Sequence, residues 1–541
     1  MSMQRWLAKI LGKQGAAEQD APFPLPWPGD RQSIYHFISP YADGSAPLPE
    51  QAQTLPDEDT LEGELRWVAG GMDGAFGHHG GGADAEEAAD EIISALSAVL
   101  RKPSPANMNT FYALLKARPP LDYIDILTDK LPEAPSLSPQ QVHDLMVWLA
   151  TNSPDRNPVK CAIALLAFFP SDENRALVTT LGLHEEFTLF TAVALRNMLP
   201  EEAFDATLTA LAKRVTGWGR IQLIERLPDE VSPATREWLL RDGYANSVME
   251  EYTAWDCATK GRLLAALSVD AVDDGVLTGA GDILAALIAG GPARDIHDYP
   301  EGAQACHRYL TLLRRSKNDD LRNLLNTSAI GAFAGDEDNN WETLQAEGWS
   351  DEIRQHIADD VEAIVAQEKW LTRVQQDLTA CDNGDFYLAL RAAKLLGIDT
   401  WEQVFARQQT VPNEANWYEL MQTESPQRME RILQLAEQQL DLAAIASGPD
   451  TLMGLGAEYR QHGALDFILQ DLNRFPGMGW SLIKTGLRSP VVRNRLMALN
   501  ALEGWPEEQL PAELHGMLET AFHAEPDDNV RARLEKMLAE E

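Results

Sequence analysis

Apolar residues recur at helical spacing along most of the chain, and this pattern limits the possible folds more than any other feature. In DEIISALSAVL, Ile92, Leu96 and Val99 occupy positions i, i+4 and i+7 and so share one helix face. Ile357 and Ile364 continue the same spacing in a later segment. Short Pro, Gly, Asn and Asp turns separate such segments, and no stretch alternates with the period of two typical of strands. The sequence therefore predicts an all-α fold of short helices joined by short loops.

Two segments near the C-terminus share a motif that indicates helical repeats. Residues 489–502 and 527–538 both contain Val-Arg-x-Arg-Leu, at an offset of 38 residues. Residues 153–169 begin with a similar Pro/Asp turn and continue as an apolar segment rich in small residues. The arrangement resembles the HEAT/armadillo class of α-solenoid repeats, in which Pro or Asp opens the second helix of a hairpin and Arg or Lys follows a buried Val. The matching positions are Pro490, Val492 and Arg493, then Asp528, Val530 and Arg531, and less closely Pro158, Val159 and Lys160.

The resemblance implies an α-solenoid of antiparallel helical hairpins. Each hairpin of such an array buries its apolar face only against its neighbours, and the array presents one long surface. A surface of this kind usually binds another macromolecule, so the fold-level analogy favours a binding protein over an enzyme. An irregular all-α domain without true repeats is the alternative, because residues 200–330 are helical but irregular.

Proline and glycine divide the chain into predicted regions. Proline removes a backbone donor and ends helices, so we expect the Pro-rich segment to form an extended arm, held by Trp27, Tyr35 and Phe37. The expected regions are an amphipathic helix at 1–14, a Pro-rich arm at 15–60, a Gly/His-rich loop region at 61–83, a helical repeat domain at 84–330, an acidic loop at 331–348 and C-terminal HEAT-like repeats at 349–541.

The charge balance restricts the kinds of partner. The chain has 83 acidic and 45 basic residues and a net charge of −38. Phosphate backbones attract Lys and Arg, so nucleic-acid binding is not expected. A basic protein partner suits this charge, because electrostatic attraction accelerates association. Acidity that serves solubility alone is the alternative.

Apolar stretches are all shorter than the roughly 20 residues that a membrane span needs, so we expect a cytoplasmic protein. The segment 1–14 carries Trp6, Leu7 and Ile10 on one face beside basic residues. A basic amphipathic helix of this kind can lie on a membrane or dock in a partner's groove. Packing of the helix back on its own protein is the other interpretation.

The stretch GGMDGAFGHHGGGADAEE, residues 70–87, contains seven glycines and two adjacent histidines. Asp84 stands at an N-cap position with a glutamate three residues later, which predicts an acidic capping box. Carboxylates in the first turn would repel a phosphate, so phosphate binding is disfavoured. The candidate binding residues of the loop are Asp73, Phe76, His78, His79 and Asp84.

Two interpretations of this loop remain open. His78, His79 and Asp73 supply imidazole and carboxylate ligands for a transition metal, the one cofactor that the sequence suggests. Alternatively, the glycines permit close backbone packing in a contact loop that is structural or binds a partner. Seven glycines cost more conformational entropy than helix capping alone requires, so a further constraint is expected.

A second acidic loop has partial calcium-site spacing. Asp336, Asp338, Asn340 and Glu347 fall at positions 1, 3, 5 and 12, but Trp341 replaces the glycine that the sharp turn requires. We therefore expect an acidic loop with a helix cap. The 14 tryptophans are expected in cores, although a tryptophan on the rim of a concave face would anchor a partner.

The leading functional interpretation is a protein-binding scaffold or inhibitor with a basic protein partner, in the manner of an immunity protein or antitoxin. A metal-dependent hydrolase that uses the Gly/His loop is one alternative. A membrane-surface adaptor that uses residues 1–14 is the other. A non-catalytic role is favoured, and the partner and the oligomeric state stay open.

Overall fold

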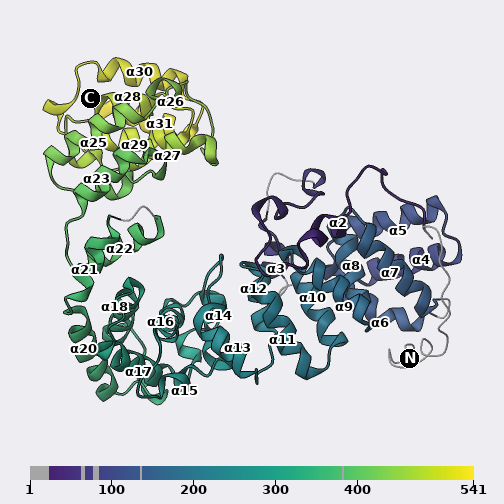
Figure 1. The fold of residues 1–541 in the computed structure, drawn as a ribbon. Helices are drawn as coiled ribbons and strands as arrows, with labels where there is room; N and C mark the ends of the chain where they lie inside the picture. Colours follow the sequence, from purple (N-terminus) through teal and green to yellow (C-terminus); the bar gives the residue numbers. More distant parts are fainter. Residues whose placement is uncertain (1–22, 62–66, 77–84, 135–136, 380–382, 541) are drawn as a thin grey trace. The chain divides into compact units, whose positions relative to one another are not determined.

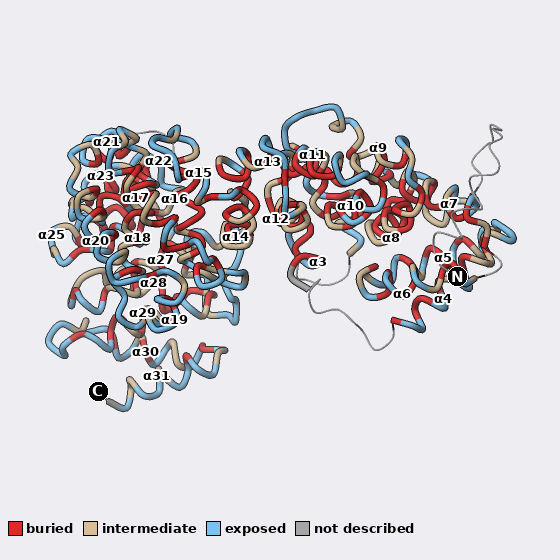
Figure 2. Tube along the Cα trace, turned by 90° about the horizontal axis from the view of Figure 1, so that it is seen from below, coloured by how far each residue is buried: buried red, intermediate tan, exposed pale blue. Residues whose placement is uncertain are grey.

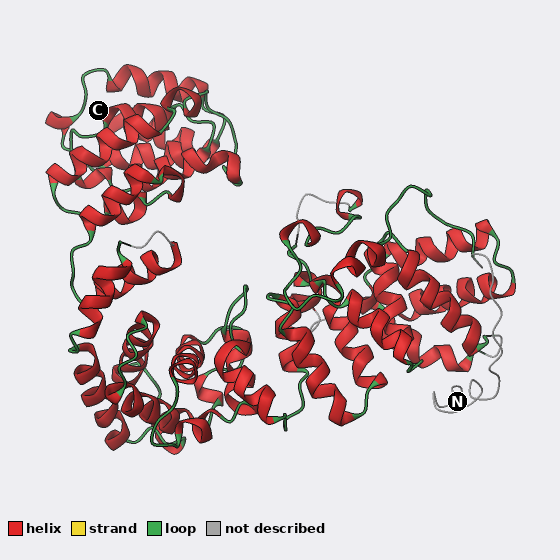
Figure 3. Cartoon of the chain, in the orientation of Figure 1, coloured by secondary structure: helices red, strands yellow, loops and turns green. Residues whose placement is uncertain are grey.

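The computed structural model describes residues 23–61, 67–76, 85–134, 137–379 and 383–540. These residues form α-helices and short 3-10 helices (Figure 3). Within them no strand occurs, and the β-pairing is limited to a single parallel bridge between Leu452 and Val491. The prediction of an all-α fold is confirmed.

The chain forms two compact units, Met1–Trp370 and Leu371–Glu541. Buried residues follow the inner faces of the helices in each unit (Figure 2). The division falls inside the range 349–541 that the sequence assigns to C-terminal repeats.

Unit 1 consists of short helices, most of which are labelled in Figure 1. Its α-helices are α2 (Ile34–Ile38), α3 (Gly71–Phe76), α4 (Ala85–Arg101), α5 (Pro105–Ala117), α6 (Ile124–Lys130), α7 (Pro139–Asn152), α8 (Arg156–Leu166), α9 (Asp172–Leu181), α10 (Glu185–Met198), α11 (Glu201–Ala212), α12 (Trp218–Glu225), α13 (Pro233–Trp238), α14 (Glu251–Lys260), α15 (Leu263–Leu267), α16 (Asp274–Ala289), α17 (Gly302–Arg315), α18 (Leu321–Gly335), α19 (Trp341–Ala346) and α20 (Asp351–Val365), and α21 (Lys369–Asp377) crosses into unit 2. A π-helix lies at Leu239–Gly243, and 3-10 helices lie at Ser39–Tyr41, Glu50–Ala52, Glu58–Thr60, Pro120–Asp122, Leu131–Glu133 and Ile296–Asp298.

Local sequence explains where these helices begin and which faces they bury. Ser350 accepts a hydrogen bond from the N–H of Ile353 and so caps α20, as serine does at helix starts. Ile357 and Ile364 on that helix are fully buried, as their spacing predicts. Asn340 caps α19 by accepting from the N–H of Thr343 at 3.3 Å. The acidic loop before this cap covers only 336–340 of the expected 331–348, because α18 continues to Gly335 and α19 begins at Trp341.

The helices of unit 1 pack mainly on near neighbours in the chain. Helix α8 contacts α10, α10 contacts α12, and the series continues through α14, α16 and α18 to α20 (Figure 1). Each of these helices therefore lies between two others. Side chains on the helix faces that no neighbour covers form the surface of the unit.

The Pro-rich arm lies on the first helices of unit 1. The ring of Trp27 stacks 5.3 Å from that of Trp148 and 4.7 Å from that of Tyr112, as expected for an arm held by aromatic residues. Arg31 donates to Asp155 at 2.9 Å. Aromatic stacking and an ion pair together fix the arm, whose described part contains α2 and three 3-10 helices rather than being extended throughout.

Unit 2 is also built of short helices. They are α22 (Asn383–Leu395), α23 (Trp401–Thr410), α24 (Trp417–Met421), α25 (Pro426–Gln439), α26 (Leu442–Ile445), α27 (Arg460–Leu469), α28 (Trp480–Leu487), α29 (Val492–Glu503), α30 (Leu514–Ala524) and α31 (Asp528–Glu540), with 3-10 helices at Pro412–Glu414, Ala457–Tyr459, Leu472–Arg474 and Glu507–Gln509. The two segments with the shared motif form α29 and α31, which contact each other. Val530 is buried as the motif predicts, but Val491 rather than Val492 is the buried valine of the other copy.

Candidate functional site

Two glycines of the Gly/His stretch lie where no side chain fits. Gly70 has a φ of 71°, and a Cβ atom at this position would lie 2.7 Å from the carbonyl oxygen of Glu185. A Cβ atom at Gly74 would lie 2.4 Å from the ring of Trp218. Close packing against α10 and α12 is therefore the constraint on these glycines. Phe76 ends α3, whereas His78, His79 and Asp84 lie outside the described residues.

Asp73 belongs to a buried ion cluster. The Nζ atom of Lys160 lies 2.6 Å from a carboxylate oxygen of Asp73 and 2.6 Å from one of Glu186. The N–H of Gly70 also donates to Glu186, at 3.0 Å. Burial alone would raise the pKa of Glu186, but Lys160 and Arg156 outweigh this effect and lower the pKa to about 2. Burial raises the pKa of Asp73 although Lys160 opposes the shift.

The same cluster holds the Pro-rich arm. Arg156 begins α8, and its guanidinium donates to Asp57 at 2.9 Å and to Glu58 at 2.6 Å. Arg156 also lies 3.7 Å from Glu186. One buried charged cluster therefore joins the arm to the helices α3, α8 and α10. Its ion pairs hold these segments together.

Candidate metal ligands do not gather among the described residues. In that part of the chain no group of three or more His, Cys, Asp or Glu side chains is placed to hold a metal ion. His184 caps α10, and its Nε2 atom lies 2.9 Å from the carbonyl oxygen of Gln53. The hydrolase interpretation depends on His78 and His79, and the membrane interpretation on residues 1–14, all outside the described ranges.

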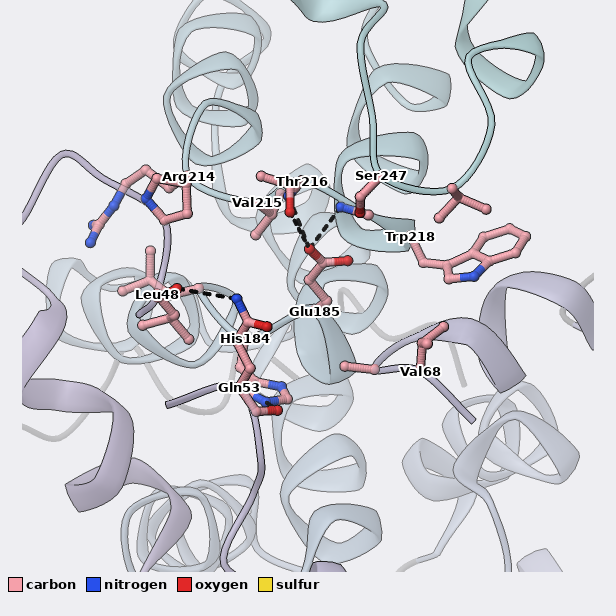
Figure 4. A pocket seen from close by; sticks show the side chains of 15 residues that line it. Leu48, Gln53, Val68, His184, Glu185, Arg214, Val215, Thr216, Trp218 and Ser247 are labelled. Carbon is pink, nitrogen blue, oxygen red and sulfur yellow. Dashed lines mark hydrogen bonds between the residues drawn. The ribbon is translucent and has the colours of Figure 1, made fainter. Parts of the chain in front are cut away.

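A pocket of about 210 Å³ lies beside the start of α12 (Figure 4). Glu185 points into it and accepts hydrogen bonds from the N–H groups of Thr216 at 2.9 Å, Gly217 at 2.8 Å and Gly219 at 3.2 Å. These donors mark a helix N-terminus, which attracts anions. The chain's own carboxylate occupies that position, so the pocket does not favour a phosphate.

Three further hollows of unit 1 adjoin one another through shared lining residues, and together they are called the trough here. The largest, of about 1080 Å³, shares Leu227 and Asp229 with a hollow of about 610 Å³. The second shares Val193 and Arg226 with a third hollow of about 360 Å³. Helices α10, α12 and α14 supply much of the lining. Gly74 borders both the first and the third hollow, so the Gly/His stretch reaches the edge of the trough.

The largest hollow presents aromatic rings that are held in place. Trp218 and Tyr252 pack with their ring centroids 5.1 Å apart. The indole N–H of Trp255 donates to the carbonyl oxygen of Asp298 at 3.2 Å. All three rings are partly exposed, in contrast to Trp370, which is fully buried. Rigid, partly exposed tryptophan and tyrosine side chains are typical anchors of binding surfaces.

Carboxylates outnumber cations in this hollow. The lining acids are Glu225, Asp229, Asp256 and Asp298, and the lining bases are Lys260 and Arg294. Lys260 is already bound, because its Nζ atom donates to the carbonyl oxygens of Ile224 and Glu225 at 2.9 Å each and lies 2.7 Å from Asp256. Burial raises the pKa of Asp256, Lys260 opposes the shift, and nearby Asp229 adds to it.

The hollow of about 360 Å³ is mostly apolar. Its apolar lining includes Leu121, Ile124, Phe168, Leu189 and Phe190. Val193 stands where this hollow meets the middle one, and it is 47% exposed. The trough therefore offers apolar contacts at one end and aromatic rings with negative charge at the other.

Sequence reasoning assigned most tryptophans to the core and missed Asp229, Tyr252 and Arg294. Trp148, Trp238, Trp370 and Trp417 are indeed buried, whereas Trp218 and Trp255 line the trough. A signal was available, because Tyr252 and Trp255 are three residues apart and share one helix face. That pattern does not distinguish a buried face from an exposed one.

Comparisons of the chain with models of protein families, with curated proteins and with solved structures find no match. No described helix combines the length and the apolar character needed to cross a bilayer. Inference about function therefore depends on the geometry of the trough.

Proposed function

We propose that the protein is a non-catalytic scaffold that binds a basic segment of a protein partner in the trough of unit 1. The observation that carries this proposal is the adjacency of the three hollows, each of which shares lining residues with the other two. Adjacent hollows of different character, one apolar and one acidic and aromatic, suit a peptide with several side chains better than a compact small molecule.

The chemistry of the two ends suggests how such a segment lies. A basic side chain fits the end lined by Trp218, Tyr252 and Trp255, because the face of an aromatic ring attracts a cation. The carboxylates of Asp229 and Asp256 add to this attraction. An apolar side chain of the partner fits the hollow at the other end.

A HEAT-like solenoid architecture accompanies this proposal. It is supported by the order of packing in unit 1, where α8, α10, α12, α14, α16, α18 and α20 contact one another in sequence. It is also supported by the contact between α29 and α31, the two helices with the shared motif. In such arrays the helices of one face supply a continuous binding surface.

An inhibitory role, like that of an immunity protein or antitoxin, is the more specific form of the proposal. The net charge of −38 supports it, because a strongly acidic protein associates rapidly with a basic target. In this form the basic segment that enters the trough belongs to the target's functional surface.

The test is a selection of binders from a random peptide library displayed on phage, with the full chain as bait. Affinities of the selected peptides are then measured for the wild type and for two variants, Val193→Glu and Val269→Glu. The two valines are matched, because they are 47% and 45% exposed, but only Val193 lines the trough.

We expect Val193→Glu to weaken binding about tenfold or more, which corresponds to about 1.4 kcal/mol, and Val269→Glu to leave it unchanged. We also expect the selected peptides to be basic. Peptides that bind both variants as well as the wild type would refute the proposal, because they would bind outside the trough.

A further inference from the structure

The exposed Arg294 already covers one aromatic ring of the trough. Its guanidinium carbon lies 4.1 Å from the centroid of the Trp255 ring. A guanidinium is planar and weakly hydrated, so it stacks on an indole better than an ammonium does. The ring of Trp255 is thus a surface that accepts an arginine, and the arginine on it comes from the chain itself.

Arg294 is carried by a short loop rather than by a helix. The loop follows the end of α16 and runs to the 3-10 helix Ile296–Asp298. Gly290 and Gly291 begin it with φ values of 69° and 126°, which are conformations that favour glycine. Among the described residues, Arg294 has no salt-bridge partner within 4.0 Å. Stacking on Trp255 is therefore the contact that positions the guanidinium.

Two carboxylates line the same hollow as Arg294. Asp229 is exposed at the edge of the hollow, and Asp256 on α14 is next to Trp255 in the chain. Arg294 lowers the pKa of Asp256 while Asp229 raises it, so both groups act on Asp256 through space. Both carboxylates belong to other segments than the loop that carries Arg294, Asp256 to α14 and Asp229 to the residues after α12.

We propose that Arg294 occupies, in the free protein, the position on the Trp255 ring that an arginine of the partner takes in the complex. The partner's arginine displaces Arg294 when it binds. The proposal rests on the proposed function and names the chemistry that the acidic end of the trough recognises. The incoming guanidinium stacks on Trp255 and faces the carboxylates of Asp229 and Asp256. Lysine is a weaker ligand here, because its compact, strongly hydrated ammonium stacks less well.

Arg294 competes with the partner's arginine, so it lowers the measured affinity by the fraction of time that it covers the ring of Trp255. A cation–π contact at an exposed site has a strength that corresponds to about a two- to fivefold preference for the covered state. Removing Arg294 should therefore strengthen arginine binding about three- to sixfold, because every molecule then has an open site.

The experiment uses the full chain with 5-fluorotryptophan at position 255 alone. The fluorine resonance is followed by NMR during titration with N-acetyl-arginine amide, its lysine counterpart and its citrulline counterpart. Citrulline has nearly the shape of arginine but no charge. Wild type is compared with Arg294→Ala and with Arg118→Ala, which removes the same charge from an exposed arginine outside the trough.

We expect N-acetyl-arginine amide to shift the resonance, with the affinity increased about three- to sixfold in Arg294→Ala and unchanged in Arg118→Ala. The lysine probe should bind more weakly and the citrulline probe should not bind. Equal affinity of Arg294→Ala and wild type, or equal effects of arginine and citrulline, would overturn the inference.

Failure of this inference is distinguishable from failure of the proposed function. Selected peptides that depend on Val193 but carry no arginine would leave the trough as the binding site and refute the role of Arg294. Peptides whose affinity is unchanged by Val193→Glu would refute the proposed function itself, whatever the fluorine resonance reports.

Discussion

Gly74 lies so close to Trp218 that a Cβ atom at residue 74 would come within 2.4 Å of the indole ring. The contact joins the Gly/His stretch to the edge of the trough, since both residues line its largest hollow. The position of the anchor ring therefore depends on the absence of a side chain at residue 74.

Gly74→Ala should displace Trp218 and destabilise unit 1 by about 1–3 kcal/mol, the usual effect of overpacking. Thermal unfolding measures the change. Gly335→Ala is the matched control, because nothing lies within 4 Å of a Cβ atom there, and its stability should be unchanged or slightly higher. Equal stability of the two variants would show that Trp218 moves aside without strain.

Lys160→Met should be strongly destabilising. It leaves Asp73 and Glu186 buried without the cation that lies 2.6 Å from each of them. Removing one partner of a buried ion pair typically costs about 3–5 kcal/mol. Denaturant unfolding measures the change, and Arg262→Ala, which removes an exposed partner of Glu230, is the control with a much smaller expected loss, because solvent screens exposed ion pairs. Similar losses in both variants would mean that the cluster does not fasten the arm and α3.

Glu250 should make the stability of unit 1 depend on pH near neutrality. Burial, Asp282 and Glu251 raise its pKa from 4.5 to about 7. Between these values the folded chain holds a proton that the unfolded chain has released, so this stability is full below pH 4.5 and is lost as pH rises through 7.

Glu250→Gln should therefore raise the unfolding midpoint at about pH 8 and leave it nearly unchanged at about pH 4. The gain should be on the order of 1 kcal/mol, because the carboxyl is only partly buried and solvent screens it. A variant that is less stable than wild type at the higher pH would contradict the assignment.

Binding of a selected basic peptide should weaken steeply with salt. The Debye length falls from about 8 Å at 0.15 M to about 3 Å at 1 M ionic strength, which screens the carboxylates of the trough. Titrations across this range measure the slope, and Asp229→Asn should make it shallower. An affinity that does not change with salt would contradict the claim that the carboxylates of the trough attract the peptide.

The sequence predicted the helices well, because apolar periodicity is a local signal. Leu96 and Ile357 are buried as their spacing requires, and Asn340 caps a helix as its position suggests. In the first copy of the repeat motif the buried valine is Val491, one residue before the predicted Val492. Local preferences and the side-chain period are enough for these features.

The site was less predictable, because it depends on contacts between distant segments. Lys160 meets Asp73 across 87 residues and Glu186 across 26, and no local pattern marks such a cluster. Trp255 lines the trough because its indole N–H donates to the carbonyl oxygen of Asp298. Trp370 is the same type of residue but is buried in the core. Which face of a helix stays uncovered is a property of its neighbours.

Hydrogen–deuterium exchange of the full chain, with and without a selected basic peptide, tests the central claim most directly. We predict slower exchange of the backbone amides in residues 189–197, 222–230 and 252–260, which carry much of the trough lining. Protection confined to residues outside the trough, in either unit, would contradict the claim that the trough is the binding site.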